Sequence, residues 1–493
     1  MASGLTNNQS LVLRPAHRET VFCKTLVVGN SIAAYTATLA ILQAGGQVCW
    51  VQAGPLNLGK TLAQHQQTQR AESRFSWRQG RRISPWEDAT VMSQSQQAFW
   101  ASWQPQLTIA AANSRSARAQ RAVLPAAAPS NPASRDRQFR EAIAPYLQNQ
   151  QLILISQGIP IRVLYTHSRG HRRVHQVVFQ ETTTHQRFQV HARLVLDATP
   201  EARLLADLVE DAGDSLPAEL VLTRSQLQTA WRQTARGIFF TDTIAVVMAN
   251  GEDKRTQPCP LAVPLRSLML QKTDGFLCVS LPGCTSDLRS LFQQPRAQWA
   301  LGEAAGQVAA RAAQIGGLQA LRATDHWPWR LQQTLVRQGI PLFAFDDVDL
   351  KDPDFEAIQM VAIADVVRTT RRRDLSFRPE TPVTKAVLAS ALMRLPPPQQ
   401  QPTPDAAEAL QDVTANHWAV DAIQAVIARQ LLTLETESHF APSKVISQRQ
   451  LGQVLQPLYP ADIVPPLSRD NTPARRRHLS RSLYPIINSR LSS

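Results

Sequence analysis

The stretch Leu26-Val27-Val28-Gly29-Asn30-Ser31-Ile32-Ala33-Ala34 decides the fold that the sequence predicts. An apolar run enters a glycine, and an apolar segment of helical character continues to about residue 44. A second glycine turn precedes the apolar run Val48-Cys49-Trp50-Val51, which ends at Gln52. Strand, tight turn, helix and strand is the context of the G-x-G-x-x-G motif, whose helix N-terminus directs its N–H groups at a pyrophosphate.

The motif retains only its first glycine, Gly29. Ser31 stands at the second glycine position, Ala34 at the third, and Gln52 where an acid usually binds the ribose. The Ser31 hydroxyl can bind a phosphate, and the Gln52 amide can donate and accept hydrogen bonds. These residues therefore predict a dinucleotide site, and an ordinary βαβ unit that binds no nucleotide is the alternative.

Length and charge restrict the class of protein. A chain of 493 residues, of which 43% are hydrophobic, has room for several globular domains. The formal net charge is +14, so nucleic acid, a membrane surface and an acidic ligand are all candidate partners. The basic residues are spread over every predicted domain with few aromatic residues beside them in sequence, which favours a solvated basic surface over a nucleic-acid partner.

Several features are missing from the sequence. The five cysteines form no C-x-x-C pair, which indicates a reducing compartment. The first twenty residues lack the apolar core of a signal peptide, and no run approaches the ~18 apolar residues of a membrane span. We therefore expect a cytoplasmic protein without a membrane span. No metal-ligand spacing is found, and no catalytic acid, base or nucleophile can be named.

Composition divides the chain into parts. Alternation of apolar and polar residues over 161–165, 174–180 and 187–197 predicts an antiparallel β insertion. The predicted parts are a flexible arm at 1–22, a main domain at 23–345 with an exposed linker at about 111–136, a region of two helical repeats at 346–460, and a basic, mobile tail at 461–493.

Four later segments resemble a known family. Residues 192–199, Ala-Arg-Leu-Val-Leu-Asp-Ala-Thr, resemble the "DATG" strand of FAD-dependent oxidoreductases with the glutathione-reductase-type flavin-binding fold, although Pro200 replaces the glycine. Val263-Pro264-Leu265-Arg266-Ser267-Leu268 and the strand at 275–280 resemble two further segments of that family. The helix at 301–310, Leu-Gly-Glu-Ala-Ala-Gly-Gln-Val-Ala-Ala, resembles its "lGqAAGvAAa" helix.

The resemblance implies an α/β fold, an FAD/NAD(P)-binding Rossmann-like domain with an antiparallel β insertion, and FAD as the cofactor. It implies flavin-mediated redox chemistry on a small-molecule substrate that the sequence does not identify. The implied contacts are Gly29, Ser31 and Ala34 at the pyrophosphate, Gln52 at the ribose, Val163 near the adenine, Ala198 on the returning strand, and Gly302, Glu303, Ala305 and Gly306 beside the flavin, where a helix dipole would stabilise its reduced, anionic form.

The C-terminal region contains an internal repeat. Asp347-Val348 aligns with Asp412-Val413 at an offset of 65, and Phe377-Arg378-Pro379 aligns with Phe440-Ala441-Pro442 at an offset of 63. The two copies, 346–395 and 410–456, predict a small all-α domain in which Thr384 and Ser447 cap the second helix of each copy. In the second copy Trp418, Ile423 and Ile427 share one helical face, which predicts that they are buried.

The second copy resembles an S-layer homology repeat. That resemblance implies contact with a cell-wall polymer, whereas the missing export signal favours a helical accessory domain that packs on the flavin domain or contacts a protein partner. The damaged motif leaves a non-enzymatic alternative for the whole chain. In it, a vestigial flavin fold and the repeats serve as a scaffold or binding protein.

Overall fold

The computed structural model describes most of the chain in two compact units. Unit 1 comprises Met1–Leu227, Val247–Pro258 and Val263–Thr324, and unit 2 comprises Gln228–Val246, Cys259–Ala262 and Asp325–Ser493. The second unit thus begins before the boundary expected near residue 345. The described residues are 20–54, 58, 92–103, 132–168, 170–200, 202–210, 218–226, 240–249, 259–367, 375–395, 410–460, 463 and 470–492.

A mixed sheet with a parallel centre organises unit 1. The strands are β1 (Thr20–Val28), β2 (Val48–Gln52), β3 (Leu152–Ser156), β4 (Gly158–Ser168), β5 (His171–Glu181), β6 (Arg187–Asp197), β9 (Thr273–Asp274) and β10 (Phe276–Cys278). The strand order is β3-β2-β1-β6-β5-β4, with β10 on β6 and β9 on β5. Strands β3, β2, β1, β6 and β10 pair in parallel, whereas β4, β5 and β6 pair antiparallel. This topology confirms the predicted α/β class with its antiparallel insertion.

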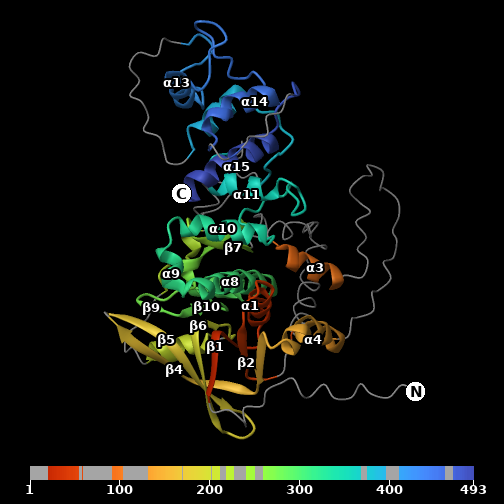
Figure 1. Ribbon diagram of the computed structural model, residues 1–493, viewed down its shortest axis with the longest axis vertical. Helices are drawn as coiled ribbons and strands as arrows, with labels where there is room; N and C mark the ends of the chain where they lie inside the picture. The colour runs from red at the N-terminus through yellow and green to blue at the C-terminus, as the bar shows by residue number, and fades with distance from the viewer. Residues whose placement is uncertain are drawn as a thin grey trace, which may run out of the picture. The chain divides into compact units, whose positions relative to one another are not determined.

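Two helices pack side by side against the parallel strands (Figure 1). Helix α1 (Ile32–Gln43) joins β1 to β2, and α8 (Pro295–Ile315) returns after β10. Strand β2 is buried at every position, as expected for a parallel strand covered on both faces. The remaining helices of unit 1 are α3 (Gln94–Trp103), α4 (Pro132–Gln148), α5 (Arg203–Glu210), α7 (Arg289–Phe292), α9 (Leu318–Ala323) and the short 3₁₀ turns η3 (Leu265–Ser267) and η4 (Ser286–Leu288).

The ends of two predicted segments differ from expectation. Residues 20–22 of the predicted arm already belong to β1, because they continue its pairing with β6. The last residues of the predicted linker begin α4, and the rest of the linker lies outside the described residues. Among the helices of the described residues, none combines the length and apolar character that a membrane crossing requires.

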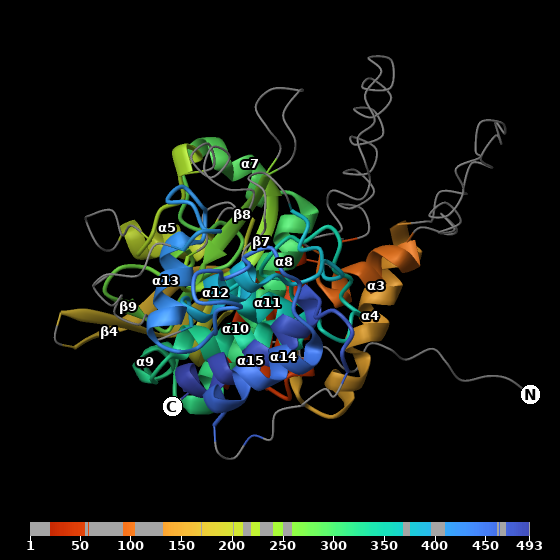
Figure 2. The ribbon, with the colours of Figure 1, turned by 90° about the horizontal axis from the view of Figure 1, so that it is seen from above.

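Unit 2 is mainly helical. Its helices within the described residues are α10 (Trp327–Arg337), α11 (Phe355–Ile363), α12 (Lys385–Leu392), α13 (Val420–Ala428), α14 (Gln448–Leu455), η5 (Gln456–Leu458) and α15 (Arg476–Ser492). Two short strands, β7 (Thr243–Ala249) and β8 (Cys259–Pro264), pair with each other, and only their first four residues are assigned to this unit. Figure 2 shows α11 to α15 gathered together, and α12 packs on α13 while α15 packs on α11 and α14. Thr384 and Ser447 cap α12 and α14, as predicted.

The two repeats make the same internal contacts. The Asp347 carboxylate accepts hydrogen bonds from the backbone N–H groups of Phe377 and Arg378, at 2.7 and 2.6 Å. In the second copy Asp412 accepts from Phe440 and Ala441, at 3.0 and 2.6 Å. The aspartate of each D-V pair therefore holds the loop that carries the F-x-P sequence.

A third segment joins these two in a closed ring of backbone hydrogen bonds. Val383 N–H donates to Ala474 O at 2.7 Å, Ala474 N–H to Ile446 O at 2.8 Å, and Ile446 N–H to Val383 O at 3.0 Å. Three further backbone hydrogen bonds flank this ring, because the N–H group two places after each ring residue donates to the carbonyl group two places before another ring residue. These bonds run from Lys385 to Lys444, from Gln448 to Thr472, and from Arg476 to Thr381. Residues 472–476 therefore occupy a third position equivalent to 381–385 and 444–448.

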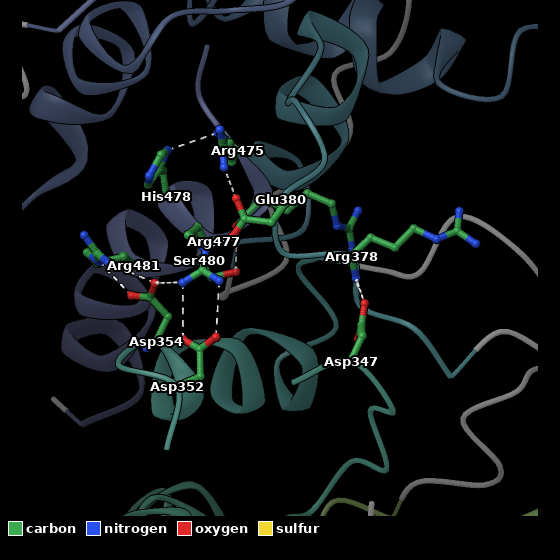
Figure 3. A network of polar contacts seen from close by, with 11 residues as sticks. Asp347, Asp352, Asp354, Arg378, Glu380, Arg475, Arg477, His478, Ser480 and Arg481 are labelled. Atoms are coloured by element: carbon green, nitrogen blue, oxygen red, sulfur yellow. Dashed lines mark hydrogen bonds and ion pairs between the residues drawn. The ribbon is translucent and has the colours of Figure 1, made fainter. Parts of the chain in front are cut away.

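The ring includes Ala474, which lies within the tail at 461–493 that was predicted to be mobile, so that prediction is corrected. Helix α15 buries Leu479, Leu483, Ile486 and Ile487 completely. Arg477 and Arg481 of this helix form ion pairs with Asp352 and Asp354, which precede α11, so the basic composition does not mark a solvated chain end (Figure 3). The structure also corrects the predicted burial of Trp418, which is 64% exposed, because it lies in the turn before α13, whereas Ile423 lies within that helix and is fully buried.

Candidate functional site

The glycine turn after β1 is closed by the end of β6. Gly29 has φ +128°, and a Cβ there would stand 2.6 Å from the carbonyl carbon of Ala198 and 2.8 Å from the nitrogen of Thr199. Gly29 N–H donates to Val51 O, and Ala198 N–H donates to Val28 O, both at 2.9 Å. Only glycine fits, because three parallel strands end against one another at this point.

Ser31 caps α1 and also ties the turn to β6. Its Oγ accepts from the N–H of Ala34 at 3.2 Å and donates to Ala198 O at 2.6 Å. In the part of the chain that the structure describes, the N–H groups of Ile32 and Ala33 have no hydrogen-bond acceptor. No acidic side chain lies in the first turn of α1. The start of α1 therefore carries positive electrostatic potential with donors left over, as an anion site requires.

The end of β2 lies beside the same turn. Trp50 Nε1 donates to Gly29 O at 2.7 Å, and its ring is fully buried. Gln52 is the last residue of β2 and is only 4% exposed. The predicted residues Gly29, Ser31, Ala34, Gln52 and Ala198 are thus brought together at the carboxyl edge of the parallel strands.

Val163 lies elsewhere, on β4 in the antiparallel layer, and its side chain belongs to the apolar core. Its backbone N–H donates to Asp207 Oδ2 at 2.5 Å. Asp207 belongs to α5, which packs against β4. The N–H group of Val163 is therefore bound within the chain itself, and a position of Val163 near the adenine stays a prediction.

The glycines of α8 pack on α1. A Cβ on Gly302 would stand 2.7 Å from Ala33 Cα, and one on Gly306 would stand 2.8 Å from Ala40 Cβ. Helix α8 begins at Pro295, so Gly302 to Gly306, with the buried Ala305 among them, lie two turns inside it. The predicted dipole role of Gly302 to Gly306 is wrong, because the unpaired N–H groups of a helix occupy its first turn only.

The first turn of α8 nevertheless reaches the carboxyl edge of the sheet. Gln298 Nε2 donates to Ser280 O at 2.7 Å, and Ser280 Oγ donates to Thr199 O. Thr199 directly follows Ala198, which closes the Gly29 turn. The starts of α1 and α8 are therefore connected through the ends of β6 and β10, and neither first turn contains an acid.

Glu303 turns toward α3 instead. Its carboxylate accepts hydrogen bonds from the hydroxyl groups of Ser93 and Ser95, and Trp299 Nε1 donates to Ser95 Oγ at 3.2 Å. Burial raises the pKa of Glu303, and the two hydroxyl donors partly oppose that rise. In the described structure Glu303 connects two helices of unit 1.

Asp197 is a buried acid at this edge that sequence reasoning did not single out. Its carboxylate accepts from the backbone N–H groups of Thr199, Leu204 and Leu205, each at 3.1 Å, and from Thr199 Oγ1 at 2.7 Å. Burial raises its pKa to about 6 despite these donors. The signal was present in the Asp-Ala-Thr sequence, since an aspartate shortly before a helix is a frequent cap.

The cysteines near this edge are poor nucleophiles. Cys278 is buried beside Asp197, and burial, reinforced by that carboxylate, raises its pKa well above the usual range. Burial also raises the pKa of Cys284 to about 11. Both thiols are therefore protonated at neutral pH. Among the described residues no group of three histidine, cysteine or acidic side chains is placed to hold a metal ion.

Comparisons with known proteins give only distant likenesses. No protein-family model and no curated protein matches the chain. A THI4 from Thermovibrio ammonificans is 12% identical with a TM-score of 0.28, over 59% of this chain and 89% of that one. A geranylgeranyl bacteriochlorophyll reductase-like protein from Thermoplasma acidophilum is 10% identical with a TM-score of 0.29, over 77% and 98% of the two chains. The fold class therefore rests on the topology of the chain itself.

Proposed function

We propose that this chain is an FAD-dependent oxidoreductase-like protein that holds FAD at the carboxyl edge of the parallel strands. The observation that carries the proposal is the connection of two acid-free helix starts, those of α1 and α8, through the ends of β6 and β10. Diphosphates bind where the carboxyl ends of parallel strands meet such a helix start. The resemblance of the four sequence segments to FAD-dependent oxidoreductases supports the same proposal.

The residues present fit the pyrophosphate part of the cofactor. The N–H groups of Ile32 and Ala33 are the donors, and Gly29 leaves room for the close approach of β6. Gln52 is placed to bind the ribose, with an amide in place of a carboxylate. The resemblance places Val163 near the adenine, and its N–H group donates to Asp207. When bound, FAD supplies a reversible electron acceptor.

The chain contributes position and electrostatics. The start of α1 offsets the negative charge of the diphosphate, and the Ser31 hydroxyl can exchange Ala198 O for a phosphate oxygen. The start of α8 offers a second positive end, and Gln298 fixes its position. Asp197 keeps the last residues of β6 in place through its bonds to Thr199 and α5.

The test is flavin binding by a charge variant. Asn30 lies in the turn between Gly29 and Ser31, and Asn30→Asp adds one negative charge without changing its shape. We expect the purified full chain to show the flavin absorbance spectrum after incubation with FAD, and Asn30→Asp to weaken FAD binding about tenfold, equivalent to ~1.4 kcal/mol. Asn149→Asp, in an exposed turn, is the matched control. A wild-type protein that shows no flavin absorbance after incubation with excess FAD and removal of the unbound FAD refutes the proposal.

A second candidate function is a non-enzymatic scaffold or binding protein. The observation that favours it is the closure of the cofactor contacts by the chain itself: Ser31 bonds Ala198, and Asp207 bonds Val163. In that case the repeats of unit 2 contact a protein partner or a cell-wall polymer, and the exposed Trp418 is their most accessible large apolar residue. Loss of capture of either partner by Trp418→Ala, with capture retained by Val445→Ala, supports this function.

A further inference from the structure

One face of the sheet in unit 1 is exposed and carries aromatic and basic side chains. Strands β4, β5, β6 and β1 are neighbours in that order (Figure 1). Alternate residues of β5 and β6, including Val177, Phe179, Phe188 and Val190, are buried in the apolar core. The intervening residues face the other way, as in an antiparallel sheet with one solvated face.

Two aromatic rings lie flat against each other on this face. Phe22 of β1 pairs in register with His191 of β6. Their ring centroids are 4.9 Å apart and the ring planes differ by 17°. Phe22 is 73% exposed, more than any other large hydrophobic residue of the described chain. One side of its ring covers His191, so its other side is open to a flat ligand.

Two cations follow the rings at the next position of the same face. Cys23 pairs with Ala192 and Thr25 with Leu194, so this register brings Lys24 beside Arg193, and both side chains are exposed. Like charges directly opposite each other on neighbouring strands destabilise a sheet. Neither forms a salt bridge within the part of the chain that the structure describes. Arg187 of β6 and Arg162 of β4 add exposed positive charge to the same face.

A row of amide groups joins three strands beside these residues, and its innermost member, Gln176, is only 8% exposed. Gln176 Nε2 donates to Gln189 Oε1, and Gln189 Nε2 donates to Thr20 Oγ1 at 2.9 Å. Amide and hydroxyl groups can form hydrogen bonds with the edges of bases or with sugar hydroxyls. The exposed ring of Phe22, the cations Lys24 and Arg193, and the row of amide groups therefore lie beside one another on the same sheet.

We propose that this face binds single-stranded nucleic acid, with a base stacked on Phe22 and a phosphate between Lys24 and Arg193. An exposed aromatic ring on a sheet, flanked by cations, is the surface on which proteins stack unpaired bases. An anionic membrane fits less well, because membrane binding scales with the apolar area that is buried, and the cations and amide groups named here surround one strongly exposed apolar ring, that of Phe22. The sequence concealed this surface because its cations and rings come from two strands distant in the chain.

The test measures binding of the full chain to a fluorescently labelled 20-nucleotide single strand of uridine, by anisotropy over a range of salt concentrations. We expect Phe22→Ala to weaken binding about tenfold at fixed salt. We expect Lys24→Gln with Arg193→Gln to reduce the slope of log affinity against log salt by about 1.4, since each contact to a single strand contributes about 0.7.

The matched control removes two positive charges elsewhere in unit 1, by Arg140→Gln with Lys272→Gln, both exposed. In this control variant, Phe22→Ala should still weaken binding, and the slope of log affinity against log salt should change less than it does when Lys24 and Arg193 are replaced. Far-UV circular dichroism of each variant establishes that it is folded. Failure of the wild type to bind the strand at low salt overturns the proposal. So does equal binding by all variants, or Phe22-dependent binding only to vesicles of anionic lipid.

Discussion

Gly302→Ala tests whether α1 and α8 need bare backbone where they cross. An alanine in a relaxed helix interior would gain about 1 kcal/mol over glycine. Here the added Cβ would collide with Thr36 Oγ1 and Ala33 O and stand 2.7 Å from Ala33 Cα. Because two of these three atoms are backbone, the helices must separate, and overpacking of this kind costs about 1–3 kcal/mol or more. Because all three contacts are shorter than 3.0 Å, we take the upper part of that range, about 2–3 kcal/mol, and expect a net destabilisation of unit 1 of about 1–2 kcal/mol.

The assay is thermal unfolding of the full chain, followed by the fluorescence of its tryptophans, with the two units treated as separate transitions. A loss of this size lowers Tm by about 2–4 °C per kcal/mol in a domain of 150–250 residues. Gly54→Ala is the matched control, because its Cβ would meet nothing within 4 Å. A Gly302→Ala protein that melts at or above the wild-type temperature refutes the argument that contact with α1 requires glycine at position 302.

Three further predictions concern charged groups. Burial raises the pKa of Asp197 from 3.8 to about 6, so its charged form destabilises the fold as pH rises through 6; the stability of Asp197→Asn relative to wild type should therefore increase between pH 4 and pH 7, by up to about 3 kcal/mol, in urea titrations at each pH. Asp354 is buried against Arg477 and Arg481 (Figure 3), and Asp354→Ala should destabilise unit 2 by about 3 kcal/mol in calorimetry, whereas Glu141→Gln in the exposed Arg137 pair should change unit 1 by less than about 0.5 kcal/mol. His478 Nδ1 accepts from Arg475 N–H at 3.1 Å, and burial together with Arg481 lowers its pKa, so the stability it contributes is present above pH 6.5 and lost as pH falls through the lowered pKa; His478→Gln should flatten that acid limb, and an unchanged limb would contradict the assignment.

Sequence could predict what local chemistry determines. The turn at Gly29, the strands on either side of α1 and the caps at Thr384 and Ser447 each depend on residues within a few positions of one another. The alternation over β5 and β6 likewise predicted a half-buried sheet, because period-2 burial is visible in the sequence.

The rest depends on partners distant in the chain. Ser31 meets Ala198 across 167 positions, so its hydroxyl could not be known to close the turn. Gly302 resembled a cofactor contact, but its neighbour is α1. The basic segment before α15 looked solvated because its acids, such as Asp354, lie more than a hundred residues earlier. Trp418 was expected to share a helical face with Ile423, but α13 begins only at Val420, so Trp418 lies in the preceding turn and not on that face.

The backbone ring of unit 2 imposes an order on biosynthesis. Val383 and Ile446 can bond each other once both have left the ribosome, but the ring still lacks one donor and one acceptor until Ala474 emerges. Until then the edges of these segments are exposed to incorrect pairing, including pairing with another nascent chain. Any event that halts translation before residue 474 therefore leaves the ring open, with unpaired backbone groups on both repeats.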